Sequence, residues 1–252
     1  MFPVIQIGPL SLQAPGLILI LGVWVGLVIA ERSAPRFRAN PNHIYNLVFV
    51  ILVAGLLGAR LSFVLQNLEA FLQSPLNVFS LNPGLLDPWG GLAVGLLAAL
   101  IYTNRQQIPL WTLLDALTPF LSVMLIAWGL SNLASGKAFG TETQLIWGID
   151  LWGTTRHPTQ IYQMIAGATI LGIIWPSKKT TNPARVPGET FGLFLSLSAG
   201  AWLLTETFRG DSVVLPNGLR VAQVAAWLML AVSLWGWGKL RKRKPPEIPD
   251  SV

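Results

Sequence analysis

The sequence predicts an all-helical membrane protein that crosses the bilayer seven times. Of its 252 residues, 52% are hydrophobic and 11% are charged, whereas soluble domains carry about 25% charged residues. Such a chain cannot cover a globular surface with polar groups. Several apolar runs approach the roughly 20 residues that a helix needs to span the hydrocarbon core. Helices are favoured because lipid offers no partner for unpaired backbone groups.

Seven apolar segments can be distinguished along the chain. They are roughly residues 15–30, 44–65, 89–102, 110–133, 160–175, 189–207 and 219–238. The third and fifth segments are short for straight spans, so they would need help from flanking residues or neighbouring helices. Together the seven form one predicted membrane domain, residues 1–238. A basic tail that is predicted to be disordered follows, residues 239–252.

Basic residues set the predicted orientation. Most of them fall between the first and second segments, between the third and fourth, between the fifth and sixth, and in the tail KLRKRK. Cytoplasmic loops carry an excess of lysine and arginine. We therefore expect the N-terminus outside and the C-terminus in the cytoplasm. The tail is interpreted as a membrane-surface anchor, and no nucleic-acid partner is expected.

The chain contains no cysteine and two histidines. Disulfides, thiolate metal sites and a cysteine nucleophile are therefore excluded. No metal site and no cofactor is predicted.

Ionisable groups inside the predicted spans are the first candidates for a site. Arg60 lies in the second span, Asp115 in the fourth, and Glu206 ends the sixth with Arg209 three residues later. Burying a charge in a bilayer costs at least about 2.5–3.5 kcal/mol. Each group is either a paired charge that stabilises the bundle or part of a site. Asp115 is assigned the stabilising role because it lies near the opposite leaflet from the others, and Arg60 stays open.

The stretch TTRHPTQIYQ, residues 154–163, adds polar groups at the start of the fifth span. It supplies Arg156, His157, Gln160 and Tyr162. Pro158 suits a first helical turn, so His157 is either a helix-start histidine held by local hydrogen bonds or a functional base. With Arg60, Glu206 and Arg209, these groups gather at one predicted leaflet. That convergence is what a site for a phospholipid headgroup requires.

Several stretches, in order, resemble the prolipoprotein diacylglyceryl transferases. They are IGPLSLQAPGL, GARLSFVL, the GGL after Trp89, the Asn132–Gly136 stretch, RHPTQIYQ and ETFRGD. The resemblance covers about residues 5–238. It implies a multi-pass enzyme of the bacterial inner (plasma) membrane that moves a diacylglyceryl group from phosphatidylglycerol to the lipobox cysteine thiol of a prolipoprotein. The implied partners are phosphatidylglycerol or a related anionic phospholipid and the signal peptide of the prolipoprotein.

The resemblance also implies roles for individual residues. The reaction needs a base or proton relay for the thiol and positive groups at the phosphate. On this basis the expected catalytic residues are His157, Arg156 and Glu206. The expected headgroup-binding residues are Arg60, Asn132, Lys137, Gln160, Tyr162 and Arg209.

The chain departs from the family pattern at several positions. The usual histidine before Gly-Gly-Leu is Trp89, two usual arginines are Gly129 and Trp202, a usual tyrosine is Pro15, and Lys137 stands where an acid is usual. Removing one good electrostatic donor typically costs about 10²–10³ in rate. Three hypotheses therefore stay open. The chain is a transferase with a reorganised site, a non-catalytic member that binds lipid or a lipoprotein precursor, or, less in keeping with the sequence, a small-solute transporter.

Overall fold

The computed structural model describes residues 4–7, 10–80, 82–175, 186–216 and 218–242. The chain forms two compact units: unit 1 is Met1–Arg38 with Leu114–Val252, and unit 2 is Ala39–Leu113. The expectation of a single membrane domain over residues 1–238 stays a prediction. The predicted basic positions Lys178, Lys179 and Arg185, and the tail from residue 243 onward, lie outside the described residues.

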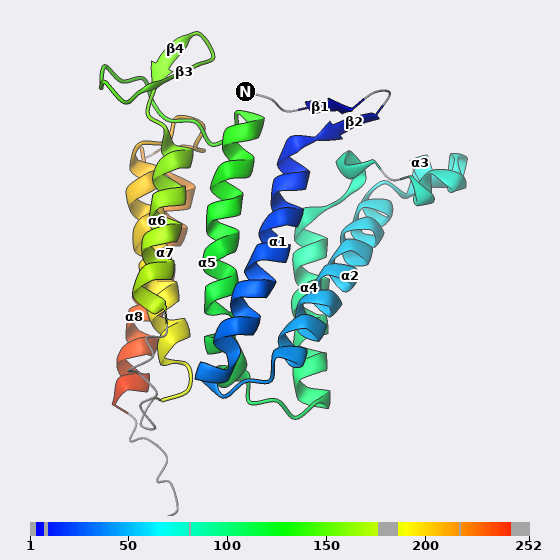
Figure 1. Ribbon diagram of the computed structural model, residues 1–252. Helices are drawn as coiled ribbons and strands as arrows, with labels where there is room; N and C mark the ends of the chain where they lie inside the picture. Colours follow the sequence, from blue (N-terminus) through cyan, green and yellow to red (C-terminus); the bar gives the residue numbers. More distant parts are fainter. Residues whose placement is uncertain (1–3, 8–9, 81, 176–185, 217, 243–252) are drawn as a thin grey trace, which may run out of the picture. The chain divides into compact units, whose positions relative to one another are not determined.

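A long helix occupies each of the seven predicted segments (Figure 1). They are α1 (Ala14–Ser33), α2 (Pro41–Gln66), α4 (Pro88–Arg105), α5 (Leu110–Ser135), α6 (Thr159–Ile174), α7 (Glu189–Thr207) and α8 (Val221–Arg241). Within the described part of the chain, four helical stretches are long and apolar enough to cross a membrane: Ala14–Phe37, α2, α5 and α8. The helix α6 is apolar but shorter. The helical fold is confirmed, and the seven crossings stay a prediction.

Unit 1 combines α1, most of α5, and α6 to α8 with two short hairpins that the sequence did not predict. The hairpins are β1 (Val4–Ile7) with β2 (Leu10–Gln13), and β3 (Ile149–Leu151) with β4 (Thr154–Arg156), both antiparallel. The first residues of α1, α6 and α8 lie at the same end as the last residues of α5 and α7 (Figure 1). We call this the cavity end of unit 1, because residues at these helix ends line a cavity.

Small residues let the helices of unit 1 approach closely, as is common in membrane bundles. A Cβ added at Gly26 of α1 would meet the ring of Phe120 on α5 at 2.8 Å, and one at Gly192 of α7 would meet Trp237 on α8 at 3.1 Å. Ile170, Ile174 and Phe194 form the buried apolar cluster between α6 and α7.

Asp115 caps the start of α7 from the neighbouring helix α5. Its side chain is almost fully buried, and its two oxygens accept hydrogen bonds from the backbone N–H groups of Gly188 (2.7 Å) and Phe191 (2.8 Å). These N–H groups are among those that a helix start leaves without partners. Asp115 therefore has the stabilising role that its position predicted.

Asp115→Ala is expected to destabilise the protein by about 3 kcal/mol, because one buried and one partly buried N–H group lose a charged acceptor. Thermal unfolding in detergent, followed by the fraction of protein that stays monodisperse, measures the change. Asp150→Ala is the matched control, because Asp150 is an exposed acid that bonds only Thr155 among the described contacts. Equal midpoints for the two variants would contradict the assignment.

Unit 2 is a pair of closely packed helices, α2 and α4, joined by α3 (Leu68–Gln73) and two short 3-10 turns, η2 (Pro75–Phe79) and η3 (Pro83–Leu85). A Cβ added at Gly91 would lie 2.9 Å from the carbonyl oxygen of Gly55. Asp87 caps α4 by accepting the N–H groups of Trp89 (3.2 Å) and Gly90 (2.9 Å). The hydrogen bond from Ser62, helped by these N–H groups, lowers the pKa of Asp87.

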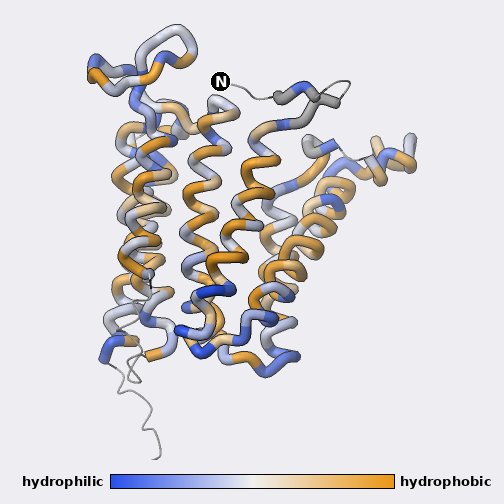
Figure 2. The backbone as a smooth tube through the Cα atoms, in the orientation of Figure 1, coloured by the Kyte–Doolittle hydropathy of each residue, from blue (hydrophilic) through white to orange (hydrophobic). Residues whose placement is uncertain are grey.

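The apolar side chains that the helices expose are those of a protein embedded in lipid. Phe49, Leu56 and Leu61 on α2, and Trp227, Leu228 and Val232 on α8, are each more than half exposed. Figure 2 shows hydrophobic residues along the lengths of the helices and hydrophilic residues at their ends. A large exposed apolar surface marks contact with a membrane or another apolar partner.

Candidate functional site

Unit 1 contains a cavity of about 1040 Å³. Residues of α1, α5, α6, α7 and α8 line it, together with the segments that follow α5 and α7. Ligand pockets usually measure about 300–1,000 Å³, so this cavity is large enough for a ligand bigger than most small metabolites.

The cavity has one polar end and mostly apolar walls. Most of its polar lining comes from the ends of the helices and the segments beside them: Gln13, Ser131, Asn132, Ser135, Lys137, Thr205, Arg209 and Asp211. Two further polar residues lie farther along the helices, Gln163 on α6 and Ser198 on α7. The lining deeper along the helices is mostly apolar and includes Leu19, Leu125, Trp128, Ile170, Trp202 and Met229. An amphipathic ligand with a charged head and long hydrocarbon chains matches this division.

The end of α5 places Lys137 at the polar end. Gly136 follows the helix with a φ of 70°, a conformation that glycine adopts without strain. The N–H of Lys137 then reaches back to the carbonyl of Asn132 at 3.1 Å, which is the bond of a Schellman cap. This turn directs the chain away from the helix and leaves the Lys137 side chain exposed.

The next residue, Ala138, is held in a left-handed conformation. Its φ is 53°, which is unfavourable for a residue with a Cβ. Two contacts hold it: its N–H donates to Asp211 Oδ2 at 3.0 Å, and its carbonyl accepts from Thr159 Oγ1 at 2.5 Å. Gln160 secures the same turn by donating from Nε2 to the carbonyl of Lys137 at 2.8 Å.

Residues 139–142 join the RHP stretch to the stretch after α7; we call them the connecting segment. On one side Thr141 N donates to the carbonyl of Phe208, and Gly210 N donates to the carbonyl of Phe139, both at 2.8 Å. On the other side His157 N donates to the carbonyl of Thr141 at 3.0 Å. Short β-bridges pair Gly140 with Arg209 and Glu142 with Arg156. Backbone pairing therefore brings the two polar stretches together.

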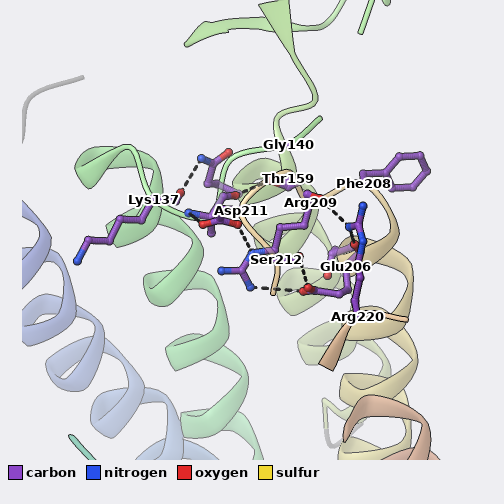
Figure 3. A network of polar contacts seen from close by, with 12 residues as sticks. Lys137, Gly140, Thr159, Glu206, Phe208, Arg209, Asp211, Ser212 and Arg220 are labelled. Atoms are coloured by element: carbon purple, nitrogen blue, oxygen red, sulfur yellow. Dashed lines mark hydrogen bonds and ion pairs between the residues drawn. The ribbon is translucent and has the colours of Figure 1, made fainter. Parts of the chain in front are cut away.

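Arg209 lies between two carboxylates (Figure 3). Its Nε donates to Asp211 Oδ1 at 2.6 Å, and its Nη1 lies 3.4 Å from Glu206 Oε2. Burial lowers the pKa of Arg209, but the hydrogen bond and charge of Asp211, followed by those of Glu206, outweigh it and raise the pKa. Glu206 is almost fully buried and also accepts from Ser212. Arg209 is thus a permanent cation with a largely compensated charge.

Arg220 closes the C-terminal end of α7. Its Nη1 donates to the carbonyls of Glu206 and Arg209, the latter at 2.6 Å. A cation at this end also complements the helix dipole. This role of Arg220 was not predicted from the sequence.

Arg156 and His157, two of the predicted catalytic residues, lie outside the cavity lining. Arg156 donates from Nε to the carbonyl of Leu151 at 3.1 Å, and its guanidinium lies over the ring of Phe139. Its other contacts are the carbonyl of Gly140 and an ion pair with Glu142, both at 3.4 Å.

His157 belongs to an aromatic cluster with Tyr162 and Phe208. Its Nδ1 lies 3.2 Å from the hydroxyl of Tyr162, and its ring centre lies 5.0 Å from that of Phe208. Trp147 Nε1 donates to the same hydroxyl at 2.9 Å. These local contacts match the reading of His157 as a histidine held at a helix start.

Arg60 lies in unit 2, where it binds backbone carbonyls. Its Nε donates to Val78 O and its Nη1 to Leu85 O, both at 2.9 Å, and its Nη2 donates to Asn77 O. The guanidinium also lies 5.7 Å from the ring centre of Phe71. Arg60 therefore holds the chain between α2 and α4 in place.

Of the nine predicted site residues, Asn132, Lys137 and Arg209 line the cavity. Five others support its polar end, namely Arg156, His157, Gln160, Tyr162 and Glu206, and Arg60 lies in unit 2. The role in catalysis or binding of each of the nine stays a prediction. Sequence reasoning did not include Asp211 among the site residues. The acid of ETFRGD, two residues after Arg209, was the available signal for Asp211. Among the described residues no group of histidine and acidic side chains could hold a metal ion.

The unusual residues of this chain concentrate in the cavity. Pro15, Lys137 and Trp202 all line it. Gly129 instead packs against α6, where an added Cβ would lie 2.7 Å from Met164 Cγ and 2.9 Å from the carbonyl oxygen of Gln160. Trp89, in unit 2, is exposed. The cavity lining therefore combines residues that match the family pattern, Asn132 and Arg209, with residues that depart from it, Pro15, Lys137 and Trp202.

Comparison with known proteins identifies the family. The model of the family described as prolipoprotein diacylglyceryl transferase matches residues 3–238. Proteins named phosphatidylglycerol–prolipoprotein diacylglyceryl transferase are similar over most of their length. The Nostoc protein is 27% identical over 98% of this chain and 93% of its own, that of Corynebacterium diphtheriae 24% over 94% and 91%, and that of Clostridioides difficile 29% over 83% of each. The resemblance inferred from the sequence is confirmed, and the chain belongs to the prolipoprotein diacylglyceryl transferase family.

Proposed function

We propose that this chain transfers a diacylglyceryl group from phosphatidylglycerol to the cysteine thiol of a prolipoprotein, at the cavity of unit 1. The observation that carries the proposal is the cavity itself, which joins Lys137 and Arg209 at its polar end to apolar walls. The names of the relatives state the same donor and acceptor. The chain is a multi-pass protein of the bacterial inner membrane, with seven spans, the N-terminus outside and the C-terminus in the cytoplasm.

Two features support this orientation. The helices of unit 1 alternate in direction, so that the cavity end collects the starts of α1, α6 and α8 (Figure 1). The opposite ends of α1 and α8 carry basic residues, Arg32 in the last turn of α1 and Lys239 and Arg241 in the last turn of α8. In this orientation the polar end of the cavity faces the outer leaflet, where an exported prolipoprotein presents its cysteine.

The residues at the polar end suit the proposed reaction. The sulfur of the thiol attacks a glyceryl carbon, so that a C–S bond forms, the C–O bond to the phosphate breaks, and glycerol phosphate leaves with the electron pair. The proton that the thiol loses ends on the leaving glycerol phosphate, which balances the reaction. Lys137 and Arg209 stabilise the negative charge on the leaving phosphate. The Asn132 amide lines the same end and can orient the headgroup.

A second candidate is a family member that binds lipid or a lipoprotein precursor without transfer. The observation that favours it is Trp202 in the cavity wall, at a position where the resemblance places an arginine. The position of the second usual arginine is also without a cation, because it holds Gly129, which packs closely against α6. Fewer fixed cations at the phosphate would slow transfer more than they would weaken lipid binding.

Complementation separates the two candidates. The full chain is produced in a bacterium depleted of its own diacylglyceryl transferase, and a reporter prolipoprotein is analysed by gel shift and intact mass. We expect the mass of one diacylglyceryl group on the reporter, and about 10²-fold less of it with Lys137→Ala. A well-produced, folded chain that leaves the reporter unmodified would support binding without transfer.

A further inference from the structure

We propose that Asp211 and Lys137 together set the charge that the cavity accepts, selecting a lipid with a single negative charge on its headgroup. This inference rests on the proposed function in taking a phospholipid as the ligand. It makes Asp211 a specificity-determining residue, although the acid belongs to neither the predicted catalytic nor the predicted headgroup-binding set.

The first step is the charge balance of the cavity lining. Among the described residues that line the cavity, three carry a charge, namely Lys137, Arg209 and Asp211. Glu206, the other acid beside Arg209, lies outside the lining and its side chain is 1% exposed. The charges that a ligand meets therefore add up to one positive charge.

The second step is the accessibility of the Arg209–Asp211 pair. The side chain of Arg209 is 34% exposed and that of Asp211 25% exposed. Asp211 occupies Nε of Arg209 at 2.6 Å, and Glu206 lies at Nη1. Asp211 therefore blocks the side of the guanidinium that Nε and Nη2 share, and Glu206 competes for Nη1, so that a phosphate approaching Arg209 meets a carboxylate on either side. Among the described contacts, Nη2 of Arg209 has no partner, and both of its N–H groups can donate to a ligand.

The third step concerns Lys137, the cation of the lining whose charge no described carboxylate balances. Among the described residues its ammonium group forms no ion pair, and in Figure 3 its side chain extends away from Asp211. The Asn132 side chain lines the same end and also has no described hydrogen bond. A phosphodiester would pair its one negative charge with the positive charge of Lys137 and would accept hydrogen bonds from the neighbouring polar groups.

The resulting rule concerns the number of negative charges on the lipid headgroup. A phosphodiester such as phosphatidylglycerol carries one negative charge and neutralises the cavity lining. A phosphomonoester such as phosphatidic acid carries roughly 1.5 to 2 negative charges near neutral pH, so it leaves excess negative charge beside Asp211, which is unfavourable at close range. A zwitterionic lipid such as phosphatidylcholine brings no net charge to balance Lys137. Because the walls are apolar, tight binding requires the acyl chains of the lipid as well as its headgroup.

Native mass spectrometry of the purified full chain in detergent tests the rule. The protein is titrated with phosphatidylglycerol, phosphatidic acid, phosphatidylcholine and soluble glycerophosphoglycerol, without any prolipoprotein. The wild type is expected to bind phosphatidylglycerol in preference to the others. Asp211→Asn, which keeps the shape of the side chain and removes its charge, should raise the affinity for phosphatidic acid relative to phosphatidylglycerol about tenfold.

Two further variants keep the test decisive if Asp211→Asn folds poorly. Lys137→Gln removes a side chain without described contacts, so it should fold, and it should lose most of the preference for phosphatidylglycerol over phosphatidylcholine. Asp150→Asn is the matched control, because Asp150 is an acid outside the cavity lining, and its lipid preferences should equal those of the wild type.

Three results would overturn the proposal. They are an unchanged lipid ratio in folded Asp211→Asn, an unchanged preference in Lys137→Gln, or equal binding of glycerophosphoglycerol and phosphatidylglycerol. The binding measurement needs no transfer. A chain that fails the complementation experiment can therefore still obey the charge rule, and a chain that lipidates its reporter can still violate it.

Discussion

Gly140→Ala is expected to lower the stability of the protein by about 3 kcal/mol or more. A Cβ at this position would lie 2.9 Å from the carbonyl carbon of His157 and nearer still to its oxygen and its Cβ. Two of these three atoms belong to the backbone, so no rotation of a side chain relieves the overlap. The bridge from Gly140 to Arg209 must then open, and the polar end of the cavity loses its frame.

Thermal unfolding in detergent measures the effect, with an expected fall of the midpoint by about 10 °C. Gly172→Ala serves as the control. Gly172 lies in α6 with nothing within 4 Å of an added Cβ, and alanine is the better helix former by about 1 kcal/mol. The control should match or exceed the wild type. A Gly140→Ala midpoint at the wild-type value would show that the connecting segment shifts without cost.

Gly129→Arg, which restores an arginine usual in the family pattern, is expected to damage the protein. The new Cβ would meet Met164 Cγ at 2.7 Å and the carbonyl oxygen of Gln160 at 2.9 Å. The helices α5 and α6 would have to separate before the guanidinium could reach any ligand. We expect a loss of stability of about 3 kcal/mol or more and no gain in binding of phosphatidylglycerol.

Trp202→Arg is the informative comparison for Gly129→Arg. Trp202 lines the cavity and is 36% exposed, so an arginine can occupy its place and add a positive charge. This variant should fold and bind anionic lipids more tightly, as measured by the same lipid titration. A stable Gly129→Arg protein with increased affinity for phosphatidylglycerol would disprove the packing argument.

The sequence predicted the helices well because hydrophobic length is a local property. The predicted segment 189–207 coincides with α7, and 110–133 differs from α5 by two residues at its end. The β3–β4 hairpin was missed because its strands have three residues each, too few for an alternating pattern to show. Arg156 of this hairpin pairs with Glu142 of the connecting segment, and a single segment of sequence does not reveal that partner.

The site was predicted in part. Sequence reasoning found the stretches that meet at the polar end, because orientation places helix ends on one side. It could not tell which polar groups remain available to a ligand. Arg156 uses its donors on the carbonyls of Leu151 and Gly140 and on Glu142, and Arg60 uses three on backbone carbonyls. An arginine in a sequence is the same letter whether its donors are occupied or free.

The pairing of the connecting segment with both polar stretches affects how mutational screens of this protein should be read. A screen that records only loss of lipidation will flag Arg156, His157 and Gly140 whether or not any of them meets a substrate, because each helps to build the same small assembly of backbone strands. Residues that act on the ligand are those whose replacement alters lipid preference while the unfolding midpoint stays constant. Measuring lipid preference and the unfolding midpoint for every variant would separate residues that hold the pocket in shape from residues that contact the ligand.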